Sequence, residues 1–367
     1  MSIAKIGAQI DELDTPTLLI DLDTMERNIE TMAGFFRSVP AELRPHAKTH
    51  KCPVIAQKQI EAGAIGVTCA KLGEAEAMVA GGIRDVLIAN QVVGEPKVTR
   101  LVNLAEHSDV IVAVDSYINM RHLADRAKSK GVRLNVLVEV DIGNNRCGTD
   151  PGEPTLELAR EVAGHNNLNL RGLLGYEGFC QNIRDIEERR EKAHGAMAKL
   201  INTKELLEEK GLDMEIVSAG GTGTHMITGR YPGVTEVEAG SYVFMDATYS
   251  RVEGLEHFNC ALTVLTTIMS LPRQGVAVCD AGLKAITIEP SRPLPTVKGL
   301  NGVLYERASE EHGRLKVEPD SGLRVGDKLE VIVSHCCTNT NLYDYYHCIR
   351  EGSLEDLWKI SARGKSQ

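Results

Sequence analysis

Short runs of hydrophobic residues alternate with longer amphipathic segments through the first two-thirds of the chain. The longer segments are helix-like and lie at 23–36, 74–80, 118–129, 154–163 and 186–209. In the last of them the apolar residues recur at helical spacing. The apolar runs are short enough for buried strands. They lie at 43–47, 66–70, 85–89, 109–114, 134–140, 172–176, 215–219 and 236–240.

Eight strands with helical segments between them predict a (β/α)8 barrel of the TIM type. An open, flavodoxin-like sheet joined to a β-domain is the alternative. After about residue 250 the long helical segments stop, and turn sequences separate apolar runs at 262–269, 275–279, 328–333 and 358–361. We therefore predict a barrel at 23–250 and a β-rich domain at 251–367. Segment 1–22 is expected to add a strand, at 17–21, to the β-rich domain.

Composition narrows the class of protein further. Hydrophobic residues make up 43% and charged residues 25%, and the net charge is −10. These values are typical of a soluble globular protein and do not favour nucleic acid or an anionic membrane as a partner. No apolar run approaches the roughly 20 residues that a transmembrane helix needs, and the first residues do not resemble a signal peptide. The nine cysteines form no C-x-x-C pair, so we expect a reducing, cytoplasmic location.

Lys48 lies at the end of the first predicted barrel strand, in the sequence RPHAKTHK. Barrel enzymes place their chemistry at this end of the strands. Cationic neighbours lower the pKa of an amine, as a Schiff-base lysine requires, and here they are Arg44, His46, His50 and Lys51. A solvated basic edge is the alternative interpretation.

Two loops follow the seventh and eighth predicted strands, where barrels frequently bind phosphate. Glycine lets the backbone approach an anion, and successive N–H groups can hold it. The first loop contains Ser218, Gly220, Gly221, Thr222 and Gly223, and the second contains Gly240, Ser241 and Tyr242. A phosphate site together with a poised lysine points to pyridoxal phosphate as the cofactor.

Arg146 follows the fifth predicted strand. Because an arginine does not give up its proton, it would leave the pyridine nitrogen of such a cofactor unprotonated and moderate its electron withdrawal. A structural salt bridge with Glu139 or Asp141 is the alternative.

Together these motifs resemble the fold-type III pyridoxal-phosphate enzymes, the alanine-racemase-like barrels. The resemblance is to the branch of D-threonine aldolases, 3-hydroxy-D-aspartate aldolases and D-serine dehydratases, and it extends from Asp14 to Gly364. It implies that Lys48 binds the cofactor as a Schiff base, that Arg146 faces the pyridine nitrogen, and that His46 and Tyr176 line the cofactor. It also implies a homodimer.

His335 and Cys337 form a candidate pair of metal ligands. In an extended segment, residues two apart point to the same face, so imidazole and thiolate could reach one divalent ion. An H-x-C sequence alone is weak evidence, but the resembling branch places its metal here. Its aldolases carry His-x-Asp and its dehydratases His-x-Cys, and the softer cysteine favours zinc over manganese.

The resemblance therefore implies a metal-dependent lyase of β-hydroxy-D-amino acids. The resemblance to the aldolases is the broader one and favours retro-aldol cleavage to glycine and an aldehyde, whereas Cys337 favours a dehydratase. Asn182 stands where the aldolases would have a histidine base, and an amide cannot serve as that base. A metal-bound hydroxide or another histidine, His46 or His312, would have to replace it. A racemase and a non-catalytic cofactor carrier are the remaining alternatives. The β-rich region after residue 250 argues against a carrier.

Overall fold

The computed structural model describes residues 5–367; residues 1–4, the start of the predicted segment 1–22, lie outside the described residues. The chain forms two compact units. The β-rich unit comprises residues 5–31, Thr49–Cys52 and Ser241–Arg363, and the barrel unit comprises Met32–Lys48, Pro53–Gly240 and Gly364–Gln367. The domain boundaries expected after residues 22 and 250 stay predictions.

The barrel unit contains a parallel sheet in the order β2-β9-β8-β7-β6-β5-β4-β3. A strand is found in each of the eight predicted segments. The strands are β2 (Glu42–Leu43), β3 (Val67–Cys69), β4 (Asp85–Gln91), β5 (Asp109–Val114), β6 (Leu134–Glu139), β7 (Leu168–Gly175), β8 (Ile216–Ala219) and β9 (Glu236–Val237).

The sheet closes on itself just beyond the end of β2. Pro45 has no N–H group and interrupts the regular strand. The chain nevertheless continues to bond on both sides, because His46 N donates to Ala239 O (3.1 Å) and Ala47 N donates to Thr68 O in β3 (2.7 Å). A parallel bridge joins His46 and Thr68. This closure confirms the (β/α)8 barrel and excludes the open flavodoxin-like sheet.

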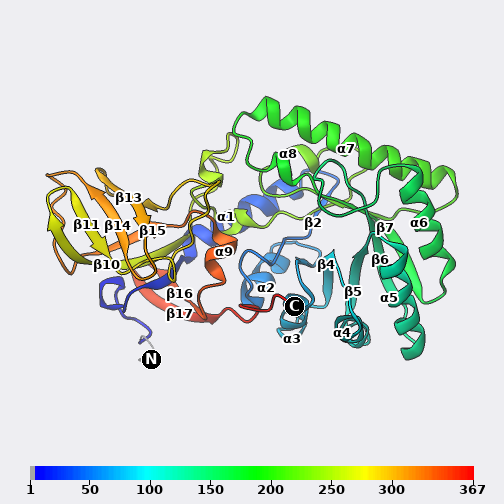
Figure 1. Ribbon diagram of the computed structural model, residues 1–367, viewed down its shortest axis with the longest axis horizontal. Helices are drawn as coiled ribbons and strands as arrows, with labels where there is room; N and C mark the ends of the chain where they lie inside the picture. The colour runs from blue at the N-terminus through cyan, green and yellow to red at the C-terminus, as the bar shows by residue number, and fades with distance from the viewer. Residues whose placement is uncertain (1–4) are drawn as a thin grey trace. The chain divides into compact units, whose positions relative to one another are not determined.

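Helices lie around the outside of the barrel strands (Figure 1). All five predicted helices are present, whereas α2, α4 and the short α8 were not predicted. A proline in the first turn of α4 is a helix-start signal that could have identified it. The helices of the barrel unit are α2 (Pro53–Glu61), α3 (Leu72–Ala80), α4 (Glu95–Ala105), α5 (Tyr117–Lys130), α6 (Glu153–Gly164), α7 (Ile186–Glu209) and α8 (His225–Thr228), and α1 (Leu22–Phe36) begins in the β-rich unit and ends in the barrel unit.

Apolar side chains from successive strands fill the barrel interior. This cluster consists of Leu87, Ile111, Ala113, Leu137, Leu174 and Ile216, all buried. Because helices cover the outer face as well, both faces of each strand are buried, and the strands appear in the sequence as continuous apolar runs.

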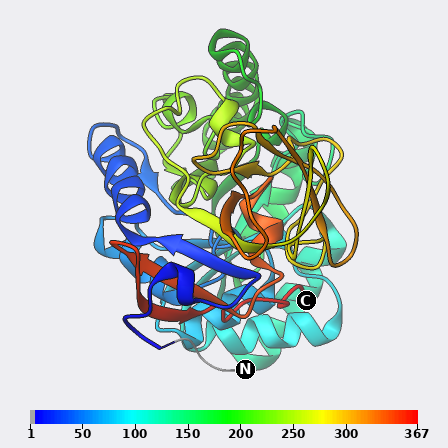
Figure 2. The same cartoon turned by 90° about the vertical axis from the view of Figure 1, so that its left-hand side faces the viewer.

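The β-rich unit is built on a mostly antiparallel sheet in which β1 lies between β10 and β16. Figure 2 shows β1, in blue, beside the red ribbons of β16 and β17. The strands are β1 (Thr17–Asp21), β10 (Leu262–Arg273), β11 (Val276–Cys279), β12 (Thr296–Val297), β13 (Val303–Ala308), β14 (Gly313–Val317), β15 (Lys328–Ile332), β16 (Tyr345–Arg350) and β17 (Ser353–Lys359). The short helix α9 (Cys336–Thr340) follows β15.

Sequence patterns located only part of this sheet. The strand predicted at 358–361 is largely wrong, because β17 ends at Lys359 and begins at Ser353. Strands β12, β13, β14 and β16 were not predicted. In β14 the buried and more exposed positions alternate, which is the signature of a strand with one covered face. Within residues 5–367 no helix is both long and apolar enough to cross a bilayer.

Candidate active site and metal centre

Lys48, Arg146 and Tyr176 come together at the C-terminal ends of the barrel strands. Lys48 Nζ lies 5.7 Å from the centroid of the Tyr176 ring, and Arg146 Cζ lies 5.5 Å from it. Tyr176 directly follows β7, while Arg146 lies in the loop after β6. Three residues that are far apart in the sequence therefore share one aromatic surface at the end of the barrel where catalytic groups gather.

The cationic cluster expected around Lys48 is only partly present. Arg44 is 3% exposed, and its Nε lies 3.0 Å from both carboxylate oxygens of Glu236. A second ion pair joins Arg44 to Asp85. Arg44 is thus neutralised by two acids, and the prediction that it acts as a free cation beside Lys48 is wrong. His46 is buried, with Nδ1 3.5 Å from Lys48 N.

Arg146 forms a salt bridge with Glu139, one of the two partners that the sequence allowed. Its Nη2 lies 3.8 Å from Glu139 Oε1, and Gln91 donates to the other oxygen of Glu139 (2.5 Å). Asp141 is occupied elsewhere, because it accepts backbone N–H groups within its own loop. The Arg146 side chain is 54% exposed, so its guanidinium keeps free donors that a ring nitrogen could meet.

The buried carboxylate of Glu177 stabilises the glycine loop after β8. Glu177 accepts hydrogen bonds from Gly220 N (3.1 Å) and from the hydroxyls of Thr224 (2.6 Å) and Thr228 (2.7 Å). Gln181 accepts from Gly223 N (2.9 Å). These bonds fix the loop that contains Thr222. Neither Glu177 nor Gln181 was predicted to take part.

Two glycines of this loop are needed for a reason other than the one expected. Gly220 has φ of +80°, which favours glycine. A Cβ atom on Gly223 would lie 2.1 Å from the carbonyl oxygen of Gln181. The expectation that glycine is present to admit an anion therefore misses the main constraint on Gly223, which is close packing against Gln181.

The second loop offers donors that suit a phosphate. Gly240 and Ser241 are buried, and their backbone N–H groups donate to no other group within the part of the chain that is described. Ser241 begins a short 3₁₀ helix, Ser241–Val243, whose first N–H groups lack intrahelical partners. Buried N–H groups normally find a partner, so the residues fit the phosphate of pyridoxal phosphate. The Tyr242 ring is fully buried and lies 5.9 Å from Phe258.

Ser218 serves a different group, because its hydroxyl donates to Glu238 (2.8 Å). Burial raises the pKa of Glu238 to about 7; the Ser218 hydrogen bond opposes this shift, and nearby Glu236 adds to it. Lys48 is among the charges that act on this carboxyl. Glu238 is therefore a buried acid close to the candidate lysine that titrates near neutral pH.

Replacing Glu238 with glutamine should flatten the pH dependence of stability. The pKa in the folded protein lies above the ordinary value of 4.5, so the stability that Glu238 contributes is present at low pH and is lost as the pH rises through about 7. The loss is on the order of 3 kcal/mol. Urea unfolding at pH 5 and pH 8 would measure it, with Glu157→Gln on the surface of α6 as the control. An unchanged slope in Glu238→Gln would contradict the assignment.

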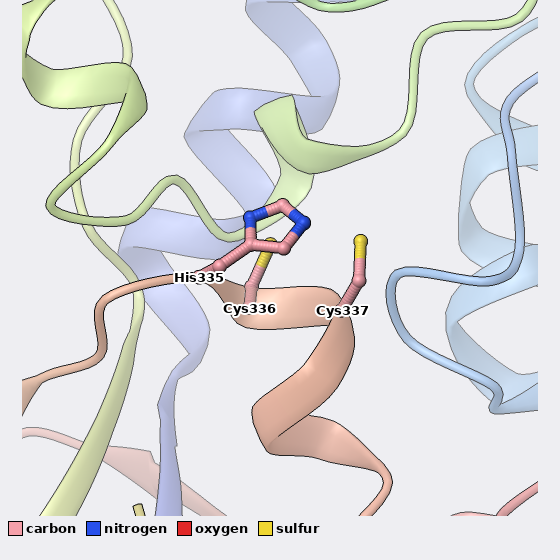
Figure 3. A group of neighbouring side chains, drawn as sticks. All are labelled: His335, Cys336 and Cys337. Atoms are coloured by element: carbon pink, nitrogen blue, oxygen red, sulfur yellow. The ribbon is translucent and has the colours of Figure 1, made fainter. Parts of the chain in front are cut away.

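His335, Cys336 and Cys337 form a cluster of potential metal ligands in the β-rich unit. Their ligand atoms all lie within 4.8 Å of one another. Figure 3 shows the three side chains on the same side of the chain. Burial alone would lower the pKa of His335, but Cys337 and Asp246 raise it to about 10. The cluster therefore favours a positive charge, and nitrogen and sulfur donors fit zinc.

The expectation that His335 and Cys337 lie on one extended segment is wrong. His335 is extended, with φ −144° and ψ 130°, but Cys336 and Cys337 form the first turn of α9. The turn brings Cys336 into the cluster as well, which the H-x-C pattern did not indicate. Thr49 Oγ1 lies 3.3 Å from Cys337 Sγ, and Thr49 is the residue that follows Lys48 in the chain.

The position where the base is missing and one of its candidate replacements are both exposed. Asn182 is exposed in the loop before α7, and His312 is exposed in the turn between β13 and β14. The other candidate replacement, His46, is buried, and its ring lies beside Lys48.

The barrel, the lysine at the C-terminal ends of its strands and the two loops after β8 and β9 define the class as an alanine-racemase-like barrel. Residues 20–248 match the family described as alanine racemase, N-terminal domain, and residues 261–349 match the putative serine dehydratase domain. The chain therefore belongs to the alanine-racemase-like family of barrel enzymes, for which pyridoxal phosphate is the expected cofactor.

Within this family the chain is similar to named aldolases. It is 38% identical to a 3-hydroxy-D-aspartate aldolase of Paracoccus denitrificans, over 98% of this chain and 94% of that one. It is also 38% identical to a D-threonine aldolase of an Arthrobacter species, over 99% and 96%. The crystal structure of D-threonine aldolase from Filomicrobium marinum has a TM-score of 0.97 and 40% identity, and covers 99% of both chains.

A dehydratase is more distantly similar. The D-threo-3-hydroxyaspartate dehydratase of a Delftia species is 29% identical over 95% of this chain and 97% of that one. One solved structure of the enzyme, with TM-score 0.88 and 28% identity over 96% of this chain and 98% of that one, is a cysteine-to-alanine mutant in the metal-free form. The aldolases and dehydratases are lyases.

Proposed function

We propose that this protein is a lyase that uses pyridoxal phosphate and a divalent metal to cleave β-hydroxy-D-amino acids to glycine and an aldehyde. The observation that carries the proposal is whole-chain similarity to D-threonine aldolase, together with a lysine at the C-terminal end of the barrel. Whole-length similarity also argues against a bare cofactor carrier. Similarity to alanine racemases is 15% identity and concerns the fold alone.

In this proposal each part of the site has one task. Lys48 holds the cofactor through Nζ, Arg146 faces its ring nitrogen, and Tyr176 supports the ring. The loops with Thr222, Gly240 and Ser241 bind its phosphate through backbone N–H groups. When bound, the cofactor supplies the electron sink at the substrate α-carbon.

His335 and Cys337 hold the metal, which when bound withdraws electrons from the β-hydroxyl of the substrate. A proton must leave that hydroxyl in the cleavage. Asn182 cannot accept it, and buried His46 beside Lys48 is the residue we assign to this step. We further propose that the protein is cytoplasmic and that it forms a homodimer. Sedimentation analysis would test the homodimer.

A dehydratase is the second candidate, and Cys337 is the observation that favours it. In that reaction Lys48 Nζ would take the α-proton, and the β-hydroxyl would leave. One assay separates the two candidates: purified protein with cofactor and zinc or manganese is given D-threonine, D-serine and 3-hydroxy-D-aspartate. Glycine with an aldehyde supports the aldolase, and ammonia with a 2-oxo acid supports the dehydratase. Metal-independent racemisation, or no reaction at all, would contradict both.

Cys337 should also set the metal preference, which we propose is zinc over manganese. Changing Cys337 to aspartate replaces a soft ligand with a hard one, so the ratio of zinc to manganese affinity should fall roughly tenfold or more. Competition titrations with a chelator would measure both affinities. Cys260→Ser, at a half-buried cysteine outside the cluster, is the control and should leave the ratio unchanged. An unchanged ratio in Cys337→Asp would count against Cys337 as a ligand.

A further inference from the structure

We propose that Asp246 is a positioning residue for the metal: it holds His335 in the tautomer that presents Nε2 to the ion. The inference rests on the proposed metal site and deepens it. It concerns contacts within the β-rich unit alone.

Asp246 is fully buried and accepts four hydrogen bonds. Its Oδ1 accepts from the backbone N–H groups of Thr248 (3.0 Å) and Tyr249 (2.9 Å). Its Oδ2 lies 2.8 Å from His335 Nδ1 and accepts from Cys336 N (3.0 Å). Backbone N–H groups of the next turn thus hold Oδ1, while Oδ2 contacts the metal cluster.

The contact with His335 selects a tautomer. A carboxylate can only accept hydrogen bonds, so the proton between Asp246 and His335 belongs to Nδ1. In a neutral imidazole the other nitrogen, Nε2, then carries the free electron pair that a metal requires. Carboxylate, histidine and metal in this order are a recurrent arrangement in zinc proteins, where the carboxylate fixes the ring and raises its basicity.

The same oxygen also places the cysteine ligand. Cys336 N–H is the first backbone donor of α9, and Cys337 is the next residue of that turn. A single carboxylate oxygen therefore fixes the ring of His335 and the turn that carries Cys337. A shift of the His335 ring, or of the backbone at the start of α9, would break a bond to Asp246.

Backbone strain directly before Asp246 indicates that the placement of this carboxylate is constrained. Met245, directly before Asp246, has φ of +50°, a region that costs a non-glycine residue roughly 1–2 kcal/mol. Met245 is buried, and its N–H donates to Ser241 O (2.7 Å). The strained turn directs Asp246 toward the cluster. Such strain persists where the surrounding contacts over-determine it.

Asp246→Asn is the informative variant. Its Oδ1 still accepts from Thr248 and Tyr249, but its amide group now faces His335 Nδ1. The ring must then accept there and carry its proton on Nε2, which removes the electron pair for the metal. We expect zinc affinity of the cofactor-loaded protein to fall about 10–100-fold. The thiolate-to-cobalt absorption band of the Co²⁺-substituted protein should weaken in parallel.

Two controls separate this role from a structural one. Asp280→Asn changes another aspartate of the β-rich unit that accepts several hydrogen bonds, from Thr15, Thr266 and Thr267, and it should bind zinc normally. His335→Ala should lose zinc. If the unaltered protein binds no zinc, the proposed metal site fails. If His335→Ala loses zinc and Asp246→Asn retains it, the positioning role alone is overturned.

A second measurement does not depend on the folding of a variant. ¹⁵N NMR of the unaltered, zinc-loaded protein should show His335 protonated on Nδ1. Protonation on Nε2 would overturn the inference.

Discussion

Replacing Lys48 with alanine should abolish the visible absorption band of the bound cofactor and lower activity by roughly 10³-fold or more. The covalent link requires a primary amine, and alanine has none. Lys48 is also one of two cations that lie over the Tyr176 ring, the other being Arg146. Absorption spectroscopy and the substrate assay measure the two losses. Borohydride reduction followed by peptide mapping should place the cofactor on Lys48 in the unaltered protein.

Lys48→Arg separates the amine from its charge. Arginine keeps a cation over Tyr176, but its guanidinium is not a usable nucleophile, so this variant should also lack the band. Lys97→Ala, at an exposed position on α4, should keep both band and activity. A band that persists unchanged in Lys48→Ala would place the cofactor elsewhere.

Replacing Arg44 with methionine should destabilise the protein by about 3–5 kcal/mol. Arg44 and Glu236 are each 3% exposed, and the guanidinium also pairs with Asp85. Without Arg44, Glu236 would be a buried carboxylate with no counter-ion, and that uncompensated charge accounts for most of the loss. Urea-induced unfolding at neutral pH would measure the effect.

Arg171 provides a matched comparison within the same barrel. It also makes a bidentate pair with a glutamate, Glu215, at 2.7 Å, but the Glu215 side chain is 61% exposed. Arg171→Met should therefore cost no more than about 1 kcal/mol. The double variant Arg44→Met/Glu236→Gln should recover part of the loss, because the unpaired charge is gone. Equal losses in Arg44→Met and Arg171→Met would contradict the burial argument.

Much of the barrel could be predicted because its strands are buried on both faces. Continuous apolar runs such as 109–114 and 134–140 are typical of strands covered by helices on one side and the barrel core on the other. The β-rich sheet was harder. An exposed leucine, Leu304, lies within β13, and charged residues occupy exposed positions along β14, so hydrophobicity alone did not mark these strands.

By itself the sequence determined the order of the strands, the ends at which chemistry would gather, and the residue types of the site. Lys48 and Arg146 were predicted because a parallel barrel brings the C-terminal ends of all its strands to one face, whereas Tyr176 was implied by the family resemblance. The H-x-C sequence also identified His335 and Cys337 as a candidate pair of ligands. These features depend on periodicity and chain order, which a sequence contains directly.

Tertiary structure alone decided which charges and donors are free. Arg44 is sequestered by Glu236 and Asp85, residues distant in the chain, so it does not add its charge to Lys48 as the sequence suggested. Asp246 contacts His335, which lies 89 positions later in the sequence. The start of α9 at Cys336 also replaced an expected extended segment. Pairing, burial and tautomer depend on distances across the fold, and for this reason the local pattern identified the ligands but not the carboxylate that orients them.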